Sequence, residues 1–396
     1  MILAKPKAMI VAGVMSGTSA DGIDVAICRV SPGSAAPRVK VLGHRACAYP
    51  AKLRKAVLAA MDAKSTSTAE LARLNWRLGD MYAEAVDLAS GEIGVKPQLI
   101  ACHGQTIYHQ SAPMSYLGAP VRCTWQTGEA SVLAERMRVP VISDFRPADM
   151  AAGGQAAPLV PMFDFCAFRD ARKSRVLLNL GGIANVTVLP AACRAEDVLA
   201  FDTGPANMVI DACMERLFGR SFDRNGTAAA RGRVLDNVLA PLMRAPYFSA
   251  APPKSCGREQ YGKDFVTRFI SRCERAGARK EDVIATATAF TSKTVADAFA
   301  RFCKPHAERL APSSKIELIV AGGGVHNGTL MRMLAEDLAS ENVHVRTIDQ
   351  SGVPAAAKEA AAFALLGWLT WHGLPGNLPS ATGAARPVIL GKVTLA

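Results

Sequence analysis

The stretch from Val11 to Val25, VAGVMSGTSADGIDV, decides how the rest of the chain is interpreted. An apolar run stops at a Gly-Thr-Ser turn, and a second extended run follows Asp21-Gly22. Glycines and small hydroxyl residues let successive backbone N–H groups approach an anion without steric obstruction. The stretch therefore predicts two strands joined by a phosphate-binding turn. An ordinary hairpin is the alternative, because Asp-Gly alone is a common turn between strands.

Length and composition indicate two globular domains. The 396 residues are 50% hydrophobic and 20% charged, which is typical of folded proteins and sufficient for more than one core. The cysteines are scattered singly without a Cys-x-x-Cys pair, so we expect reduced thiols rather than a metal centre or a disulfide framework. No apolar run reaches membrane-spanning length, and we expect a cytoplasmic protein with no membrane partner.

The formal net charge of +12 is compatible with nucleic acid, an anionic membrane surface or small anionic substrates. The densest basic cluster lacks the interleaved aromatic residues that stack on bases, and it consists of Arg169, Arg172, Lys173 and Arg175. We interpret this cluster mostly as solvated linker surface, and we expect no nucleic-acid partner.

The second half of the chain repeats the plan of the first. Each half opens with a strand, a glycine turn and a strand, and each later contains a buried strand that runs into glycine. The four segments are 11–25, 98–104, 176–188 and 316–324. We therefore expect a duplicated α/β unit, with one glycine-turn hairpin from each half facing a nucleotide.

Helical patterns connect these strands. Ser67 and Thr68 are expected to cap a helix whose apolar face includes Leu74 and Leu78. The other expected features are long helices at 282–302 and 354–371, an insertion at 223–262 and a last strand at 388–390.

Polar residues follow several of the expected strands. His103 and Gln105 follow one strand, Arg146 and Asp149 follow a second, and Asp202 follows a third. Because ligands bind at the carboxyl ends of strands in open α/β sheets, we expect these side chains near a binding site.

Eight motifs in order make the chain resemble the anhydro-N-acetylmuramic acid kinases, of the hexokinase/Hsp70/actin-like superfamily, from the first hairpin to the C-terminus. The motifs are Met15-Ser-Gly-Thr-Ser-Ala-Asp-Gly-Ile-Asp24, Cys102-His-Gly-Gln-Thr106, Ser143-Asp-Phe-Arg146 with Asp149 and Gly153-Gly-Gln155, Asn179-Leu-Gly-Gly-Ile-Ala-Asn185, Phe201-Asp-Thr-Gly-Pro205, Lys254-Ser-Cys-Gly-Arg-Glu259, Gly322-Gly-Gly324 with Asn327, and Leu374-Pro-Gly-Asn-Leu-Pro-Ser380.

The resemblance implies a two-domain actin-like/ribonuclease H-like fold, with duplicated mixed sheets flanked by helices around a central ATP cleft. The domains would be 1–172, with 365–396 packing back on it, and 173–364. The resemblance also implies ATP and Mg²⁺ as cofactors, a homodimer, and a role in recycling cell-wall sugars. In the implied reaction, water opens the bridge of 1,6-anhydro-N-acetylmuramic acid while the 6-oxygen takes the γ-phosphoryl group.

Three carboxylates are candidate catalytic residues. Opening the bridge requires a base that deprotonates the attacking water, and Asp202, on the family's Asp-x-Gly-Pro motif, is our prediction for it. Its alternative role is to cap the helix that begins near Pro205. Glu359 is a second candidate, which would otherwise only favour the positive end of its helix. Asp149 is the third.

Phosphoryl transfer requires amide groups and Mg²⁺ around the phosphates. The resemblance assigns ATP binding to Gly17, Thr18, Ser19, Ala20, Asp21, Gly22, Ile23, Asp24, Gly181, Gly182, Asn185, Gly322, Gly323, Gly324 and Asn327. Asp21 is the expected metal-side carboxylate, acting through water, because Mg²⁺ keeps several waters. A simple turn-forming role is the alternative for Asp21.

The sugar is expected to meet His103, Gln105, Arg146 and Asp149. Arg146 suits the lactyl carboxylate as a bidentate donor. A structural salt bridge from Arg146 to Asp144 or Asp149 is the competing interpretation.

Three positions depart from the family pattern: Ala206, Ala156 and the Pro147-Ala148 pair. The last removes charge near the expected sugar site, which leaves open a different amino sugar as substrate. A non-catalytic ATP-binding switch of the actin/Hsp70 kind is the other alternative. The carboxylates at 149, 202 and 359 favour an enzyme, because such a switch needs no sugar pocket.

Overall fold

The computed structural model describes residues 5–17 and 19–396, and it divides the chain into two compact units. Unit 1 combines the part through Ala167 with Ala356–Ala396, and unit 2 is Phe168–Ala355. The sequence places these boundaries after residues 172 and 364. The structure assigns the whole of helix α14 (Lys358–Trp371) to unit 1, because this helix packs against the strands of that unit.

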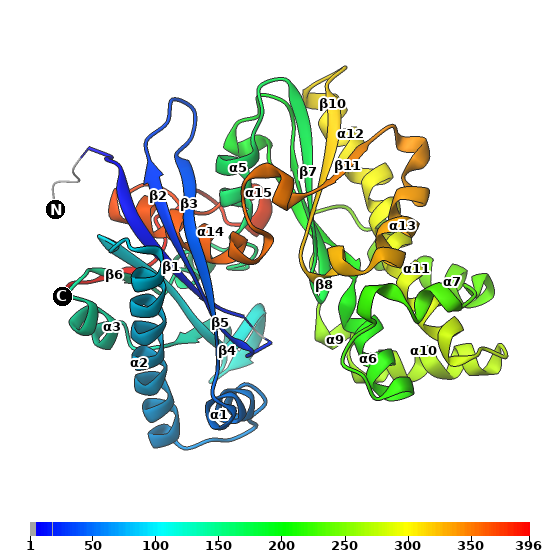
Figure 1. Ribbon diagram of the computed structural model, residues 1–396, viewed down its shortest axis with the longest axis horizontal. Coiled ribbons are helices and arrows are strands. Elements are labelled where there is room, and N and C mark those ends of the chain that lie inside the picture. The colour runs from blue at the N-terminus through cyan, green and yellow to red at the C-terminus, as the bar shows by residue number, and fades with distance from the viewer. Residues whose placement is uncertain (1–4, 18) are drawn as a thin grey trace. The chain divides into compact units, whose positions relative to one another are not determined.

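Unit 1 is built on one mixed sheet of seven strands with helices around it (Figure 1). Its strands are β1 (Met9–Ser16), β2 (Gly22–Ser31), β3 (Arg38–Ala48), β4 (Leu99–Tyr116), β5 (Ala119–Thr127), β6 (Val141–Ser143) and β12 (Lys392–Thr394). Its helices besides α14 are α1 (Ala51–Met61), α2 (Thr68–Ile93), α3 (Ala130–Met137), α4 (Pro147–Ala151), α5 (Pro161–Phe168) and α15 (Pro379–Thr382). Strand β1 is central, because it pairs antiparallel with β2 and parallel with β4.

Helices α2 and α14 cover opposite faces of this sheet. Ala12 and Val14 of β1 belong to the core that includes the buried residues of α2. Gly13, between them, points to the other face, because successive strand residues alternate. A Cβ on Gly13 would lie 2.7 Å from the backbone nitrogen of Ala364 in α14. The glycine therefore lets α14 approach β1 closely, and this contact fixes the position of Glu359 at the start of the helix.

The long helix α2 begins where the sequence predicts. The Ser67 hydroxyl accepts a hydrogen bond from the Glu70 backbone N–H at 3.1 Å and caps the helix. Leu74 and Leu78 are buried in the core, and Gly94 ends the helix with a φ of 72°. An N-terminal hydroxyl cap and a left-handed glycine at the C-terminus are the start and stop signals expected for a helix.

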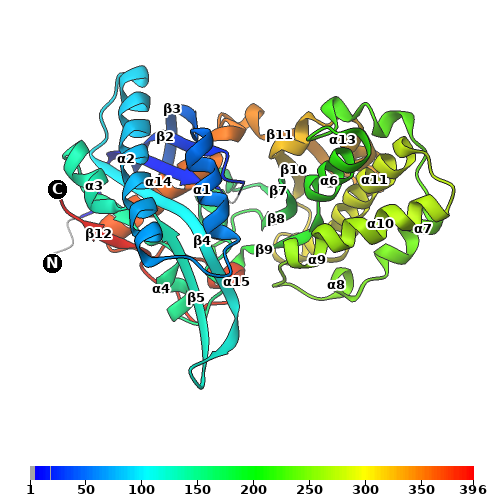
Figure 2. The same ribbon diagram turned by 90° about the horizontal axis from the view of Figure 1, so that it is seen from below.

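Strand β4 extends well beyond the part that pairs with β1. It continues with β5 as an antiparallel hairpin as far as the pair Tyr116 and Ala119. Figure 2 shows the far ends of β4 and β5 leaving the sheet as a two-stranded ribbon.

Unit 2 is built on a five-stranded mixed sheet (Figure 1). Its strands are β7 (Lys173–Leu180), β8 (Ile183–Leu189), β9 (Leu199–Pro205), β10 (Lys315–Ala321) and β11 (His344–Thr347). Its helices are α6 (Asn207–Phe218), α7 (Asp236–Met243), α8 (Pro246–Ser249), α9 (Arg258–Tyr261), α10 (Lys263–Arg275), α11 (Lys280–Ala298), α12 (Lys304–Leu310) and α13 (Gly328–Asp337).

The strand order confirms the predicted duplication. In unit 1 the order runs β3-β2-β1-β4-β6, and in unit 2 it runs β9-β8-β7-β10-β11. In each unit the first three strands of the chain are antiparallel neighbours. Two later strands, β4 and β6 in unit 1 and β10 and β11 in unit 2, add in parallel. This shared order is that of the ribonuclease H-like fold. The predicted fold class, with two mixed sheets flanked by helices, is therefore confirmed by the topology of the chain itself.

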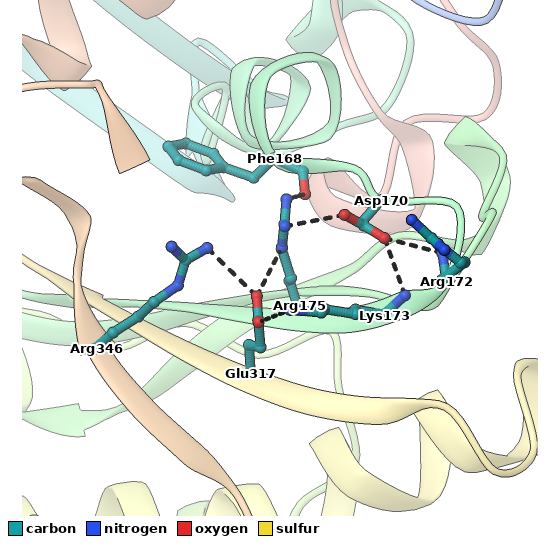
Figure 3. A network of polar contacts seen from close by, with 7 residues as sticks. All are labelled: Phe168, Asp170, Arg172, Lys173, Arg175, Glu317 and Arg346. Atoms are coloured by element: carbon teal, nitrogen blue, oxygen red, sulfur yellow. Dashed lines mark hydrogen bonds and ion pairs between the residues drawn. The ribbon is translucent and has the colours of Figure 1, made fainter. Parts of the chain in front are cut away.

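The basic cluster at the start of unit 2 is only partly the solvated linker surface that the sequence suggests, because Arg172 and Lys173 are exposed whereas Arg175 enters a polar network. Arg175 is half-buried and donates to the Glu317 carboxylate at 3.1 Å, to Asp170 at 3.0 Å and to the Phe168 carbonyl at 2.8 Å (Figure 3). A guanidinium can donate in several directions at once, so one arginine connects β7, β10 and the chain entering unit 2.

Glu317 is the centre of this polar network. It also accepts from Lys173 at 2.5 Å and from Arg346 at 3.3 Å, and only 8% of the residue is exposed. Burial alone would raise the pKa of Glu317, but the hydrogen bonds from Lys173 and Arg175 and the charge of Arg346 lower it. The Glu317 carboxylate therefore compensates three cationic side chains from the two neighbouring strands β7 and β11, which a charge count along the sequence cannot show.

Smaller differences concern the ends of elements. The last strand, β12, forms at Lys392–Thr394 rather than at 388–390, because these residues pair with β6. The expected helix at 282–302 is α11, which ends at Ala298 and continues as a π-helical stretch through Cys303. All the cysteines are free thiols, as expected. Within residues 5–17 and 19–396, no helix has the length and apolar character to cross a bilayer.

Candidate functional site

The turn after β1 is supported by Gln105. The buried Gln105 side chain donates from Nε2 to the Gly17 carbonyl at 3.1 Å, and its Oε1 accepts from Ser16 Oγ at 3.1 Å. The Ala20 N–H also donates to the Gly17 carbonyl, at 3.1 Å, and closes the turn. Thr18, expected in this turn, lies outside the described residues. Gln105 is predicted to contact the sugar, but its complete burial makes it a support for the turn.

Three of the glycines predicted to bind ATP are not required by the fold. A Cβ added to Gly17, Gly182 or Gly323 would find its nearest described neighbour at 3.7, 3.7 and 3.9 Å, respectively, which is ordinary contact. None of the three has a φ in the left-handed region. Because the described part of the chain does not demand glycine at these positions, their bare backbone is available to a ligand.

Three other glycines of the predicted set are demanded by packing. A Cβ on Gly22 would lie 2.9 Å from the Cα of Ala48. A Cβ on Gly322 or Gly324 would lie 2.8 Å and 2.5 Å, respectively, from atoms of Leu180, and Gly322 also has a φ of 84°. The absence of a side chain at these positions is explained by the fold, so it gives no independent sign of nucleotide binding.

The remaining residues of the first turn divide in the same way. Ala20 and Ile23 are buried in the core of unit 1, so only their backbone is available to a ligand. Ser19 and Asp21 are exposed, and Asp24 is half-buried.

The Gly181-Gly182 turn of unit 2 also fixes the start of helix α6. The Gly181 carbonyl accepts from the Asn207 N–H at 3.0 Å, and the Gly182 carbonyl accepts from the Ala206 N–H at 2.9 Å. The Asn207 side chain donates to the Leu180 carbonyl at 3.0 Å. These bonds hold the glycine turn against the helix and leave one side of Gly182 open.

Asn179, Asn185 and Asp202 form a polar row across three adjacent strands. Asn179 pairs with Asn185 between β7 and β8, and Asn185 pairs with Asp202 between β8 and β9. Residues directly opposite each other in paired strands project to the same face of a sheet. The three residues are half-exposed, whereas the next row along these strands lies in the core. The row therefore places two amides and one carboxylate on an accessible face.

Asp202 has the features of a general base. Its Oδ2 accepts from the Cys256 N–H at 3.0 Å, and Oδ1 has no hydrogen-bond partner within residues 5–17 and 19–396. Burial raises the pKa of Asp202 to about 6, against the effect of the Cys256 bond and with a further contribution from the Glu259 charge. The alternative role as a helix cap is wrong, because β9 continues through Pro205 and the N-cap residue of α6 is Ala206.

Lys254 anchors the segment that runs beside Asp202. The Asp202 N–H donates to the Lys254 carbonyl at 3.0 Å. The Lys254 ammonium donates to the carbonyls of Tyr247 and Phe248, both at 3.0 Å, and lies 4.7 Å from the ring centroid of Phe302. The Tyr247 hydroxyl in turn donates to the Asp202 carbonyl at 2.7 Å. The Lys254 motif, to which the sequence assigns no role, thus fixes the backbone around the base.

Glu359 is an accessible carboxylate in unit 1. It lies in the first turn of α14, where many protein atoms surround it. The residue is nevertheless exposed to solvent, so a ligand can reach it. Burial among these atoms raises its pKa, the charges of Lys358 and Arg146 oppose that rise, and the charge of Asp24 adds to it. Lys358 itself is buried in a 2.8 Å ion pair with Asp164.

Arg146 is oriented by two acceptors. Its Nε donates to His103 Nε2 at 2.9 Å, and its Nη1 donates to the Ala156 carbonyl at 2.6 Å. His103 Nδ1 lies 2.7 Å from the Gly104 carbonyl. Because a carbonyl only accepts, Nδ1 carries the proton and Nε2 is the acceptor. Burial, aided by the Arg146 charge, lowers the pKa of His103 well below its ordinary value, so the imidazole is neutral.

The structure does not give Arg146 the salt bridge that is its alternative role. Asp144 pairs with Lys392 at 2.9 Å, and no ion pair joins Arg146 to Asp144 or Asp149 in the described chain. Burial lowers the pKa of Arg146 to about 10, against the charges of Glu359 and Asp149. Arg146 therefore remains a cation at neutral pH, and its neighbouring charges are negative.

Asp149 is fully buried and has only internal partners. Its Oδ1 accepts from Asn377 Nδ2 and Thr382 Oγ1, both at 2.7 Å, and its Oδ2 accepts from the Ala156 N–H at 2.8 Å. The sequence predicts that Asp149 and His103 contact the sugar. Since both are buried, neither presents a surface to a ligand, and Arg146 is the exposed end of this group.

The carboxylates near the first turn fit a hydrated metal ion rather than a closed metal site. The Asp21 side chain is 73% exposed and lies 3.4 Å from Arg54, and Asp24 Oδ1 lies 2.8 Å from His44 Nε2. No group of three or more His, Cys, Asp or Glu residues is arranged to hold a metal in the described part of the chain. Mg²⁺ suits such a setting, because it keeps waters and takes few protein ligands.

One predicted nucleotide residue has a structural role. The Asn327 side chain accepts from the Leu330 N–H at 3.0 Å and caps helix α13. Conversely, sequence reasoning gives no role to Asn179, although this residue opens the quoted motif that ends at Asn185. The strand register, which puts Asn179 opposite Asn185, is the signal that identifies it.

Comparisons with known proteins agree along nearly the whole chain. The model of a family described as anhydro-N-acetylmuramic acid kinase matches residues 9–396. The protein named anhydro-N-acetylmuramic acid kinase in Salinibacter ruber is 43% identical over 388 residues, which are 97% of this chain and 96% of that protein. A protein of the same name in Bacillus cereus is 40% identical over 389 residues, which are 98% and 99% of the two chains.

Solved structures add less. The ROK hexokinase from Thermus thermophilus is 14% identical, with 88% of this chain and 97% of that chain covered and a TM-score of 0.33. The fold assignment depends on the strand order of the two sheets.

Proposed function

This chain belongs to the anhydro-N-acetylmuramic acid kinase family, and we propose on that premise how its residues carry the reaction. It is a sugar kinase that uses ATP. The relatives that support this share one enzyme name at 40–43% identity over nearly the full length. They do not favour a non-catalytic switch or a kinase for another amino sugar.

The proposed reaction joins a hydrolysis to a phosphoryl transfer. Water attacks the anomeric carbon of 1,6-anhydro-N-acetylmuramic acid, and the bond from that carbon to O6 breaks. The released O6 takes the γ-phosphoryl group of ATP, which leaves ADP. The products are N-acetylmuramic acid 6-phosphate, ADP and the proton taken from water. Such a product would return cell-wall sugar to metabolism.

Asp202 is the proposed acceptor of the water proton. The single observation that carries this role is its carboxylate, which has Oδ2 held by the Cys256 N–H while Oδ1 remains unbonded in the described chain. A base needs a free oxygen within hydrogen-bond reach of its proton and a pKa near the working pH. The elevated pKa of Asp202, about 6, satisfies the second condition and still leaves the carboxylate ionised at neutral pH.

Unit 1 supplies the proposed contacts to the sugar. Arg146 is half-exposed and positively charged, so it suits the lactyl carboxylate. Glu359 is an exposed acceptor for sugar hydroxyls close to the Arg146 charge. Asp149, His103 and Gln105 are buried and take positioning roles instead.

The open glycines and the accessible acidic residues are the proposed ATP side. Gly17, Gly182 and Gly323 offer bare backbone to phosphate or nucleotide. Asp21 and Asp24 would face Mg²⁺, with Asp21 acting through water. When bound, the metal would neutralise phosphate charge. We also propose, from family membership, a cytoplasmic homodimer.

The substrate assignment is tested by measuring ADP release with one sugar at a time. We expect ATP consumption with the anhydro sugar and none with N-acetylglucosamine or a hexose. Turnover of a hexose without turnover of the anhydro sugar would retain the kinase class and overturn the substrate.

The pH dependence of the reaction should report Asp202. A carboxyl group with a raised pKa is protonated below that pKa, and a protonated base cannot accept the water proton. We therefore expect kcat/KM to fall on the acid side with a midpoint near 6, the pKa of the free enzyme group. The measurement is a pH–rate profile at saturating ATP. A flat profile through this range would contradict the assignment.

The open and the packed glycines should respond differently to an added methyl group. Gly182→Ala has room for its Cβ, so we expect an unchanged melting temperature and a KM for ATP raised by about tenfold, since a displaced ligand loses its amide contacts. Gly22→Ala must displace backbone at Ala48, and we expect about 1–3 kcal/mol of destabilisation. Thermal unfolding and ATP titration of both variants check this. A destabilised Gly182→Ala with normal ATP affinity would reverse the interpretation.

A further inference from the structure

The C-terminal segment of unit 1 is bonded to the loop that follows Arg146. Asn377 and Thr382 both donate to Asp149 Oδ1 at 2.7 Å. Two backbone bonds run alongside, from the Gln155 N–H to the Thr382 carbonyl at 2.8 Å and from the Ala385 N–H to the Ala152 carbonyl at 2.9 Å. This segment includes part of the Leu374–Ser380 motif, to which neither the sequence nor the proposed reaction gives a role.

The orientation of the Asn377 amide is fixed independently of Asp149. Asn377 Oδ1 accepts from the Val388 N–H at 2.7 Å, and a backbone N–H can only donate. The amide nitrogen must therefore face Asp149. The Thr382 hydroxyl supplies a second donor to the same oxygen, so both side-chain donors to Asp149 Oδ1 come from the C-terminal segment.

Asp149 is connected to Arg146 by two hydrogen bonds through one residue, Ala156. Its Oδ2 accepts from the Ala156 N–H at 2.8 Å, and the Ala156 carbonyl accepts from Arg146 Nη1 at 2.6 Å. Ala156 is fully buried and has a φ of 59°, a conformation that alanine adopts rarely. Such a conformation persists only where the surrounding structure holds it, and the bond to Asp149 is that restraint.

The two bonds of Arg146 engage two of its three side-chain nitrogens and thereby fix the direction of the third. Nε is held by His103 and Nη1 by Ala156, whereas Nη2 has no hydrogen-bond partner in the described part of the chain. The guanidinium is planar, so fixing Nε and Nη1 also fixes the direction of Nη2. A carboxylate that binds Nη2 would therefore contact a donor whose direction is already fixed.

We propose that Asn377 and Thr382 are positioning residues for substrate recognition, which hold Asp149 and Ala156 so that Arg146 presents Nη2 to the anionic group of the sugar. This inference rests on the proposed function, because it takes the lactyl carboxylate as the group that Arg146 meets. It gives the C-terminal segment a part in selecting an acidic sugar over a neutral one.

A matched pair of substitutions at Thr382 tests the proposal. Thr382→Val keeps the shape of the side chain and removes the hydroxyl, and Thr382→Ser keeps the hydroxyl. We expect Thr382→Val to raise the KM for the anhydro sugar by about tenfold, with kcat and the KM for ATP unchanged, since a misplaced contact weakens binding. Thr382→Ser should restore the wild-type KM.

A second threonine supplies the control. Thr370, in α14, is also buried, but its hydroxyl donates to the carbonyls of Leu366 and Leu390 rather than to Asp149. Thr370→Val therefore loses a buried hydroxyl of unit 1, and one bond to the C-terminal segment, while both donors to Asp149 Oδ1 stay in place. We expect its KM for the sugar to equal that of the wild type even if its melting temperature falls.

The effect of Thr382→Val in an Arg146→Lys background distinguishes a positioning role of Thr382 from a purely structural one. In an Arg146→Lys background, Thr382→Val should raise the KM no further, because the group that it positions is gone. Equal effects in both backgrounds, an unchanged KM in Thr382→Val, or failure of Thr382→Ser to restore the KM would overturn the proposal.

Two further arrangements keep the test decisive. If Thr382→Val does not fold, Asn377→Ala removes the other donor to the same oxygen, and the same outcomes apply to it. If the wild-type enzyme does not turn over the anhydro sugar, the proposed function fails. In that case, binding of lactate-bearing and neutral sugars to the wild type and to Thr382→Val, measured by calorimetry, decides the positioning role. Equal affinities of the two proteins for the acidic sugar would overturn it.

Discussion

Asp202→Asn is expected to lower kcat by roughly a thousandfold, the usual contribution of a general base. The amide has nearly the same shape and can still accept from the Cys256 N–H, but it cannot take a proton from water. ATP affinity should be unchanged. The melting temperature at neutral pH should be equal or higher, because the raised pKa of Asp202 shows that its ionised form is disfavoured in the fold. Turnover at saturating substrates, ATP titration and thermal unfolding measure these outcomes.

Asp211 provides the matched control for this substitution. It is a carboxyl group of unit 2 whose pKa is also raised to about 6, by burial and by the charge of Asp223, but it lies on α6 rather than in the polar row. Asp211→Asn should therefore keep wild-type turnover. If Asp202→Asn turns over like Asp211→Asn, another group is the base.

Arg146→Lys is expected to lower kcat/KM for the anhydro sugar by about a hundredfold, mainly through KM, which corresponds to the loss of one strong charged contact. Lysine keeps the charge but has no planar fork. It therefore cannot bond His103 and Ala156 and still aim a third nitrogen at a carboxylate. Steady-state kinetics with the sugar varied at saturating ATP provide the measurement.

The control for Arg146→Lys is an arginine away from the site. Arg77 lies on α2 with its side chain 51% exposed and paired to Glu84. Arg77→Lys should leave the kinetics unchanged. A normal sugar KM in Arg146→Lys would show that the guanidinium does not meet the substrate, and it would remove the premise of the positioning role for the C-terminal segment.

Much of the fold could be predicted from periodic patterns. The glycine-turn hairpins, the α2 helix with its Ser67 cap and the repeat of the plan in two halves all depend on local sequence, which is where such patterns are informative. The sequence misplaces the last strand, because β12 forms through its pairing with β6, which is distant in sequence. The burial of Arg175 within the basic cluster escapes the sequence for the same reason, since Glu317 meets Arg175 only after β10 pairs with β7.

The sequence predicts which residues belong to the site, but it does not predict which of them are exposed and which are buried. Arg146, Asp149, His103 and Gln105 all follow strands, and sequence position alone makes them equivalent. The structure shows that Arg146 is accessible while the other three are buried behind it or behind the Gly17 turn. Burial is decided by packing from distant segments, here the C-terminal segment that contacts Asp149. Asn377 and Thr382 could not be found from spacing for that reason.

The most direct test of the account is the mass of the product formed from ATP and the anhydro sugar. Hydrolytic opening coupled to phosphorylation predicts a product that has gained both one water and one phosphoryl group, with one ADP released per sugar. A phosphorylated sugar that retains its anhydro bridge, or an opened sugar without phosphate, would contradict the central claim that Asp202-assisted hydrolysis and phosphoryl transfer to O6 are one reaction.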